Sequence, residues 1–527
     1  MESTTKQRLL TAGILLVMFL AAMDNMITST IMPSVISSVG GLSLYPWIGT
    51  VFMLTTTITT PLYGKLSDLY GHKRFVLIAI GIFMLGSMLC GMAQTMEQLI
   101  LFRGIQGIGG GGLVTMSFIV FGILFSPEKR AKMQSALSSV WAVASVVGPA
   151  VGAFFVETLT WRWAFYVNLP IGLLSAWTII MFLKVPKEQH TDHRIDYGGA
   201  ALFASGGILL LFGLLETSQG MSEWINYAAL GLGILLLIWL VFHERNEPEP
   251  IIPIALFSNK NFLAPVLLGF IAGSTLFSIS NLTPLFIQGA LGESAGISGR
   301  VVTGISFGWV TGSLICGRLL NKTGFRTISI FGALFMLVGL FLMKDISLAS
   351  AWWHLFIYNI ILGFGMGLIA TTTLVAVQSA VSKRTIGAAT STNQLFRSVG
   401  GTIGLSVLGG LQLGHFQQSL TKTFSTNAGE DLQKLVHQPH LILDPANRAI
   451  LPADALEKVS QALSDSVQEV FLIAFVVSFL VLIWSWQMPK ETPEMLAATV
   501  EAETKKSTKN PYSASENTAE ISISSAE

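Results

Sequence analysis

Charged residues are scarce in this chain. Of its 527 residues, 12% are charged and 51% are hydrophobic, whereas soluble chains carry about 25% charged residues. This composition excludes a string of soluble domains and indicates an integral membrane protein. The net charge of +1 gives no reason to expect a nucleic-acid partner.

Cysteine is nearly absent as well. The two cysteines, Cys90 and Cys316, both lie in apolar runs. They cannot form a disulfide framework or a cysteine metal cluster, and they are typical of small buried hydrophobic residues.

Motifs for common catalytic and nucleotide sites are also missing. The sequence has no H-E-x-x-H, P-loop or C-x-x-C segment and no Ser-His-Asp order. The segment Gly107-Ile-Gly-Gly-Gly-Gly112 matches G-x-G-x-x-G formally, but it follows no strand and opens no βαβ unit. We therefore expect no enzyme, no cofactor and no metal, and an ion gradient rather than ATP as the energy source.

Long apolar runs dominate what is present. A helix needs ~20 mainly apolar residues to cross the hydrocarbon core of a bilayer. Fourteen such runs can be counted, at about residues 9–32, 44–66, 74–94, 98–125, 132–156, 163–184, 197–216, 225–243, 261–289, 298–319, 327–344, 352–380, 386–412 and 467–487. The sequence therefore predicts an all-α protein with fourteen membrane spans.

Lysine and arginine are distributed unequally between the connecting segments. If the N-terminus is inside, most of the 31 Lys and Arg residues fall in inside segments, among them Lys73, Arg74 and Lys129. Such an excess marks the cytoplasmic loops of membrane proteins. It favours an even number of spans and both termini in the cytoplasm.

Two charged residues lie within predicted spans. Asp24 is in the first, and Arg103 opens Leu101-Phe-Arg-Gly-Ile-Gln-Gly in the fourth, with Gln106 about one helical turn further on. A charge at membrane depth costs at least ~2.5–3.5 kcal/mol and usually faces a cavity or a partner. We expect Asp24 to titrate with protons and to pair with Arg103. A structural ion pair, or for Arg103 an interfacial anchor, is the alternative.

A short basic turn, Gly64-Lys-Leu-Ser-Asp-Leu-Tyr-Gly-His-Lys-Arg74, lies between two of the runs. Gly64 and Gly71 allow a tight turn, and the charges at its end place it in the cytoplasm. We expect Gly64, Asp68, Gly71 and Arg74 to form a conformational gate, with Asp68 bonding a nearby helix end. A weaker copy, Gly317-Arg-Leu-Leu-Asn-Lys-Thr-Gly-Phe-Arg326, lacks the acid and indicates a duplicated architecture.

Two further segments stand out in the first half. Gly148-Pro-Ala-Val-Gly152 places a proline inside the fifth run, where it removes a helix hydrogen bond and allows a bend. That bend is either a hinge or a structural kink. Trp161-Arg-Trp-Ala-Phe-Tyr-Val-Asn-Leu-Pro-Ile-Gly172 lies at an outer boundary, and we interpret its aromatic residues as membrane anchors.

Together these segments resemble the major facilitator superfamily, and within it the fourteen-span drug:proton antiporters of the EmrB/QacA type. The resemblance covers about residues 9–490. It rests on the 64–74 turn, the R-x-x-Q-G element from Arg103, Gly148-Pro149-x-x-Gly152, Met23-Asp24 followed by Pro33, and above all the Trp161 run. Ala153 and Ser29 depart from the family pattern, where glycine and asparagine are usual.

The resemblance implies a domain organisation. Residues 1–190 would form an N-terminal six-helix bundle, 191–258 two extra transmembrane helices and a cytoplasmic linker, and 259–487 a C-terminal six-helix bundle. An extracellular loop is expected at 413–466, with helical spacing from Ala453 to Gln468. The composition of residues 488–527 predicts a disordered cytoplasmic tail.

The resemblance also implies export of lipophilic, cationic or amphipathic drugs in exchange for protons by alternating access, with Asp24 and Arg103 coupling the proton and Gly148, Pro149 and Gly152 as the antiporter hinge. We expect a multi-pass monomer in the plasma membrane of a bacterium. Alternatives are a narrow exporter of one antibiotic or metabolite, a proton-coupled importer, and a membrane sensor that transports nothing. Candidate substrate-lining residues are Met23, Met26, Gln106, Trp141, Trp309, Tyr358, Asn359, Asn393 and Phe396.

Overall fold

The part of the chain that the structure describes is built from helices. The computed structural model describes residues 2–40, 44–183, 196–216, 223–245, 247, 250–423 and 452–509. Its main helices are α1 (Glu2–Val39), α2 (Tyr45–Tyr70), α3 (His72–Met92), α4 (Met96–Leu124), α5 (Pro127–Thr158), α6 (Trp163–Tyr166), α7 (Asn168–Phe182), α8 (Tyr197–Glu216), α9 (Glu223–Glu244), α10 (Lys260–Leu285), α11 (Ala295–Met343), α12 (Trp352–Ser379), α13 (Ile386–Thr423), α16 (Ala453–Trp486) and α17 (Pro493–Lys509).

Eleven candidate spans among the described residues are long and apolar enough to cross a membrane. The helices α2 and α13 are not among them, because polar residues lower their mean hydropathy: α2 has a threonine-rich stretch at 55–60, and α13 carries Asn393, Gln394 and Arg397. The predicted runs 298–319 and 327–344 both lie in α11, on opposite sides of Gly324.

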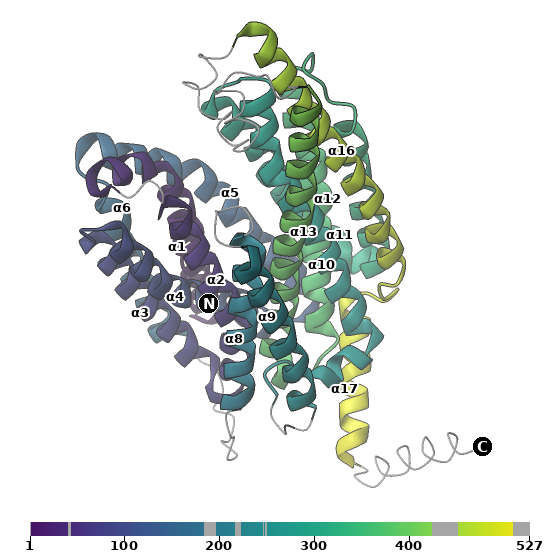
Figure 1. Ribbon diagram of the computed structural model, residues 1–527. Helices are drawn as coiled ribbons and strands as arrows, with labels where there is room; N and C mark the ends of the chain where they lie inside the picture. The colour runs from purple at the N-terminus through teal and green to yellow at the C-terminus, as the bar shows by residue number, and fades with distance from the viewer. Residues whose placement is uncertain are drawn as a thin grey trace.

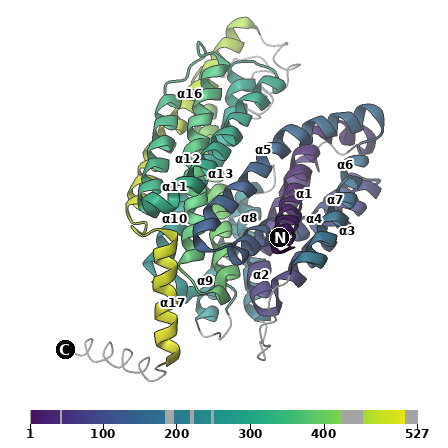
Figure 2. The same ribbon diagram turned by 180° about the vertical axis from the view of Figure 1, so that it is seen from behind.

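The helices form two groups that lie side by side (Figure 1). One group comprises α1 to α7 and the other α10 to α16, with α8 and α9 beside both. The groups converge at the end that carries α17 and diverge toward the end that carries α6, as both views show (Figures 1 and 2). The converging end, called the Asp68 end below, has a shared core in which Phe121 of α4 packs in one cluster with Phe262 of α10 and Leu374 of α12.

The weak sequence repeat has a matching backbone geometry. Gly71, between α2 and α3, has φ +98°, and Gly324, inside α11, has φ +78°. Residues with a side chain rarely adopt this region. At Gly324 it separates two helical segments that are otherwise continuous, so both copies of the motif make the same kind of sharp turn.

Two segments differ from what the sequence predicts. The expected tail includes a helix, α17, which begins with Pro493 and Glu494 and buries Leu496 to 2% exposure. The tail cannot form a core of its own, but one leucine docks α17 against α5, α11 and α12. The expected loop 413–466 is helical to Thr423 and again from Ala453, as expected for the latter part. Residues 424–451 and 510–527 lie outside the described residues.

Candidate functional site

Asp24 and Arg103 meet in the interior of the first helix group. Arg103 Nη1 donates to Asp24 Oδ2 at 2.6 Å, and the Arg103 and Asp24 side chains are 2% and 1% exposed. Gln106 joins the pair: its Nε2 donates to Asp24 Oδ1 at 2.8 Å, and its Oε1 accepts from Arg103 Nη1 at 2.7 Å. The three side chains that the sequence singled out therefore form one closed ring of hydrogen bonds between α1 and α4.

Two other helices complete this site. Asn168 of α7 donates from Nδ2 to Asp24 Oδ1 at 2.8 Å and to Ser87 Oγ of α3 at 2.9 Å. Ser87 in turn donates to the carbonyl of Phe165 at 2.8 Å. Neither Asn168 nor Ser87 was predicted from the sequence as a site residue. The available signal was that Asn168 is a polar residue within the otherwise largely apolar Trp161 run.

Small residues bring these helices close enough for the ring to form. A Cβ at Gly86 of α3 would lie 2.5 Å from the Cα of Gln106, so the helices α3 and α4 touch at the site. A Cβ at Gly148 of α5 would lie 2.5 Å from Met26 Cβ, on α1 just beyond Asp24. The helix α5 runs unbroken through Pro149, and a Cβ at Gly152 would lie 3.2 Å from Thr30 Cβ.

Asp24 is held by hydrogen bonds from three side chains. As a carboxylate, Asp24 accepts three hydrogen bonds, one of them from a guanidinium. If it became neutral, the attraction to Arg103 would fall, since an uncharged acid offers no counter-charge. Arg103 would keep Gln106 Oε1 and the ring of Phe52 on α2, whose centroid lies 4.1 Å from Arg103 Cζ. Arg103 would thus still have a hydrogen-bond acceptor and an aromatic ring as partners.

Asp68, near the end of α2, bonds the start of a helix in the other group. Its Oδ1 accepts from the N–H of Gly387 at 2.9 Å and its Oδ2 from the N–H of Ala388 at 2.8 Å, both in the first turn of α13. A carboxylate at a helix N-terminus is stabilised by the unpaired N–H groups and the helix dipole. A Cβ at Gly64 would lie 2.7 Å from the carbonyl oxygen of Gly387, so the backbones of α2 and α13 nearly touch.

The second copy of the motif makes a related contact. Asn321 of α11 donates to the carbonyl of Glu128 in the first turn of α5. A Cβ at Gly317 would lie 3.0 Å from the carbonyl oxygen of Ala131. This contact joins the same two groups with a neutral amide in place of the carboxylate.

A buried polar network, which the sequence did not predict, lies between these two contacts. Gln134 of α5 donates to Gln378 Oε1 of α12 at 3.3 Å, and Arg130 Nη1 donates to the carbonyl of Gln378 at 3.1 Å. All three residues are at most 4% exposed. The Asp68 end is therefore sealed in this structure.

The predicted substrate-lining residues have different partners in the structure, and their role stays a prediction. Phe396 lines an apolar pocket beside α8 and α9. Gln106 belongs to the Asp24 ring, and Met26 packs on Gly148. Met23 is buried in a core cluster on α1, Trp141 packs against that cluster, and Tyr358 is partly buried. Asn359 donates to the carbonyl of Val301, and Arg397 lies over the ring of Trp309. The side-chain amide of Asn393 has no hydrogen-bond partner among the described residues.

The aromatic residues of the Trp161 run are not all membrane anchors. Trp161 is 4% exposed and donates from Nε1 to Ser38 Oγ of α1 at 2.7 Å, and Phe165 is 1% exposed. The anchor interpretation is wrong for these two residues, because the run folds back onto the ends of α1 and α3. Trp163 is 47% exposed.

One group of potential metal ligands occurs among the described residues. Atoms of Asp196, His243 and Glu247 lie within 4.8 Å of one another. However, Asp196 Oδ1 already accepts from the N–H of Gly199 at 2.7 Å and lies 2.9 Å from His243 Nε2. These contacts account for the pair as a clamp between α8 and α9.

Comparison with known proteins identifies the family. Residues 14–405 match the model of the Major Facilitator Superfamily. The chain belongs to the major facilitator superfamily. It is 35% identical to Multidrug resistance protein 3 of Bacillus subtilis (strain 168) over 486 residues, which are 90% of this chain and 94% of that protein. It is 37% identical to Multidrug transporter protein MdtP of the same organism over 408 residues, 77% of this chain and 75% of that protein.

The fold agrees with this family. The crystal structure of the human organic anion transporter MFSD10 (TETRAN) is similar with a TM-score of 0.60, covering 89% of this chain and 99% of that chain at 14% identity. This major facilitator protein is thus a multi-pass membrane transporter rather than an enzyme, and its relatives support a role in drug efflux.

Proposed function

We propose that this transporter is a proton-coupled multidrug antiporter of the fourteen-span EmrB/QacA type. The observation that carries the proposal is the buried ring of Asp24, Arg103 and Gln106 with Asn168 bonded to it, which joins a titratable acid to two helices besides its own. Counting α6 and α7 as one span and α11 as two, and including α2 and α13, gives fourteen crossings. The Asp68 end faces the cytoplasm in this proposal, as do both termini.

The structure suits one stage of alternating access. The seal at the Asp68 end and the divergence at the other end are what an outward-facing transporter requires (Figures 1 and 2). A proton from outside neutralises Asp24 and loosens its hold on Arg103. The groups α1 to α7 and α10 to α16 then rock about the centre, with α8 and α9 beside them. Gly148 and Gly152 of α5 pack against α1 next to Asp24, and Pro149 between them lets α5 bend during this movement.

Energy considerations favour an uncharged cargo. One charge crossing ~100 mV gains ~2.3 kcal/mol, and one pH unit adds ~1.4 kcal/mol. One proton thus sustains a gradient of roughly 500-fold for a neutral compound, but only the pH component for a monovalent cation. Asp196 and Glu244, two other buried carboxylates, lie at the ends of α8 and α9, and Asp68, whose side chain is 6% exposed, is bonded to the start of α13. Asp24 is therefore the proton site of this proposal.

The test uses inverted membrane vesicles that hold a set pH gradient and a panel of lipophilic dyes, neutral and cationic. Asp24→Asn keeps the size of the side chain but cannot exchange a proton, so gradient-driven uptake should fall to background at normal protein level. Glu157→Gln, an exposed carboxylate change near the end of α5, should leave uptake unchanged. Gradient-driven uptake by Asp24→Asn at the wild-type rate would overturn the proposal. Uptake limited to one chemical class would favour a narrow exporter.

A further inference from the structure

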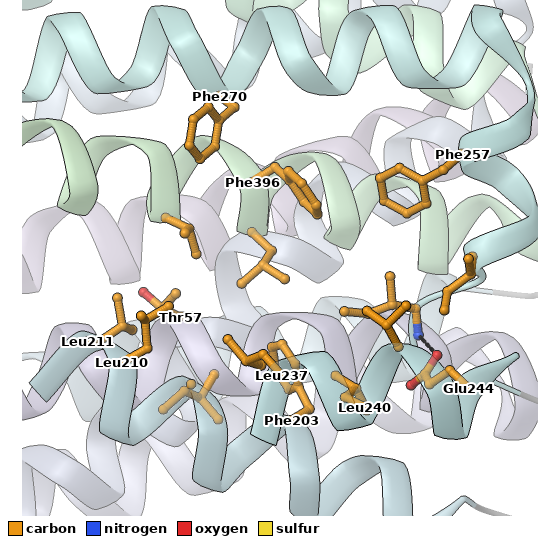
Figure 3. A pocket seen from close by; sticks show the side chains of 17 residues that line it. Thr57, Phe203, Leu210, Leu211, Leu237, Leu240, Glu244, Phe257, Phe270 and Phe396 are labelled. Carbon is orange, nitrogen blue, oxygen red and sulfur yellow. Dashed lines mark hydrogen bonds between the residues drawn. The ribbon is translucent and has the colours of Figure 1, made fainter. Parts of the chain in front are cut away.

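An apolar pocket lies between the two helix groups and the extra pair of helices, α8 and α9. Its volume is about 360 Å³, and its wall comes from α2, α8, α9, the segment 252–257, α10 and α13 (Figure 3). Ligand pockets in proteins occupy about 300–1,000 Å³ and are mostly apolar. The Asp24 ring and the Asp68 contact are not part of this wall.

One side of the pocket is mainly aromatic and the other mainly aliphatic, with Phe203 of α8 among its leucines. The rings of Phe257 and Phe396 lie 5.5 Å apart between centroids, and Phe270 lies 6.5 Å from Phe396. Leucines of α8 and α9, among them Leu210 and Leu237, face them across the cavity (Figure 3). Flat rings opposite flexible leucines suit hydrocarbon and aromatic groups of varied shape.

The acidic residue on the wall, Glu244, is bonded to the backbone. Glu244 Oε1 accepts from the N–H of Ile251 at 3.1 Å and Oε2 from the N–H of Ile252 at 2.8 Å. Both oxygens are thus used to fix the segment that follows α9, and the residue is 3% exposed. Thr57 supplies a hydroxyl further along the cavity (Figure 3). The other side chains on the wall are apolar, so the pocket fits an uncharged compound with few polar groups.

The pocket also adjoins the contact that closes the Asp68 end. Leu395 and Phe396 are about two helical turns from Gly387 on α13, and Ile58 is about three turns from Asp68 on α2. If α2 and α13 separate, the pocket opens onto the space between the helix groups. The site is thus continuous with the interface that must move in alternating access.

We propose that this pocket is a loading site for neutral lipophilic cargo that enters from the inner leaflet before it passes between α2 and α13. This inference rests on the export function proposed above. It gives the extra pair a role, because α8 and α9 provide the aliphatic side of the site. Cargo bound here favours whichever state holds it more tightly.

Two glycines allow a matched test. A Cβ at Gly207 of α8 would meet Ile58 Cγ1 at 3.5 Å, an ordinary contact, so a phenyl group at Gly207 can enter the pocket without a backbone clash. A Cβ at Gly231 of α9 would meet nothing within 4 Å, and this residue is exposed. Gly207→Phe and Gly231→Phe are thus the same change inside and outside the pocket.

Binding of Nile red, a neutral lipophilic dye, would be measured on purified protein in nanodiscs, and its gradient-driven uptake in inverted vesicles. Gly207→Phe should weaken binding ~tenfold or more and raise KM, with kcat close to wild type, because the ring occupies the cavity. Gly231→Phe should match wild type. Phe396→Ala removes an aromatic ring from the wall without adding bulk and should also weaken binding. This second variant keeps the inference testable if Gly207→Phe does not fold.

Equal Nile red affinity in all of these proteins would overturn the inference. A phospholipid with a photoreactive acyl chain provides a second test. If it cross-links to the pocket and excess Nile red does not reduce the cross-linking, the occupant is lipid and the inference is overturned. If the dye binds as expected but the wild type shows no proton-driven uptake, the proposed export function fails while the binding site stands.

Discussion

Replacing Asp68 with asparagine tests the charge that holds the two helix groups together. Hydrogen bonds to a charged group contribute ~1.5–3 kcal/mol each, compared with ~0.5–1.5 kcal/mol for neutral ones. The carboxylate accepts from both Gly387 and Ala388, whereas an amide has one acceptor oxygen and leaves one N–H without it. We expect Asp68→Asn to weaken the sealed state by ~2–3 kcal/mol, a shift of about 30- to 150-fold in its population relative to the open state.

The assay is single-molecule energy transfer between dyes on Arg74→Cys and Lys322→Cys, exposed residues near the Asp68 end of the two groups. Cys90 and Cys316 are fully buried, so they can remain in the labelled protein. Asp345→Asn is the control, since that carboxylate is 70% exposed and pairs with the adjacent Lys344.

A second variant separates charge from fit. A Cβ at Gly387 would lie 2.5 Å from the carbonyl oxygen of Gly64 and closer still to Asp68 Oδ1, so Gly387→Ala should open the same contact by steric clash. If Asp68→Asn leaves the distance distribution unchanged while Gly387→Ala shifts it, the charge argument is refuted. Backbone fit would then be sufficient for closure.

Two further predictions concern packing. Gly86→Ala should lower the free energy of unfolding by ~1–3 kcal/mol, because the added methyl group overpacks against Gln106; a lower Tm and weaker proton coupling would show this. Gly81→Ala on the same helix should change neither, because a Cβ there would meet nothing within 4 Å. Equal melting temperatures of the two variants would contradict the α3–α4 contact. Leu496→Ala should release α17 and raise the open population in the energy-transfer assay, because truncation of a buried leucine to alanine costs ~2–5 kcal/mol. Met495→Ala is the control, since Met495 is 60% exposed. Identical behaviour of the two variants would show that α17 does not hold the seal.

Much of the site could be predicted from the sequence because charges in apolar runs are conspicuous. Asp24 and Arg103 each need a partner at membrane depth, and Gln106 follows Arg103 by one turn. Asn168 and Ser87 could not be predicted as site residues. A neutral polar residue in a span does not need a charged partner, and the partner it takes depends on how separate helices pack. The ring closes through glycine contacts such as Gly86, which no linear spacing reveals.

The fold shows the same division. Apolar length gave the helices, and the glycine offsets matched Gly71 to Gly324, both of which have positive φ. The helix α17 could not be predicted from composition, because its stability depends on docking Leu496 against other helices. The pocket beside α8 and α9 was likewise invisible, since its wall combines six separate segments.

One helix links all three sites. Along α2, Phe52 lies against Arg103, Thr57 lines the pocket, and Asp68 holds α13, with Pro61 between the last two. Proline removes a backbone hydrogen bond, so α2 can flex at that point. If α2 flexes there, a displacement at Phe52 need not reach Asp68, and the Asp24 site and the contact with α13 would be coupled only loosely. Under the proposed function, such loose coupling would let some protons cross without export, so more protons would be used per exported molecule than the gradient requires.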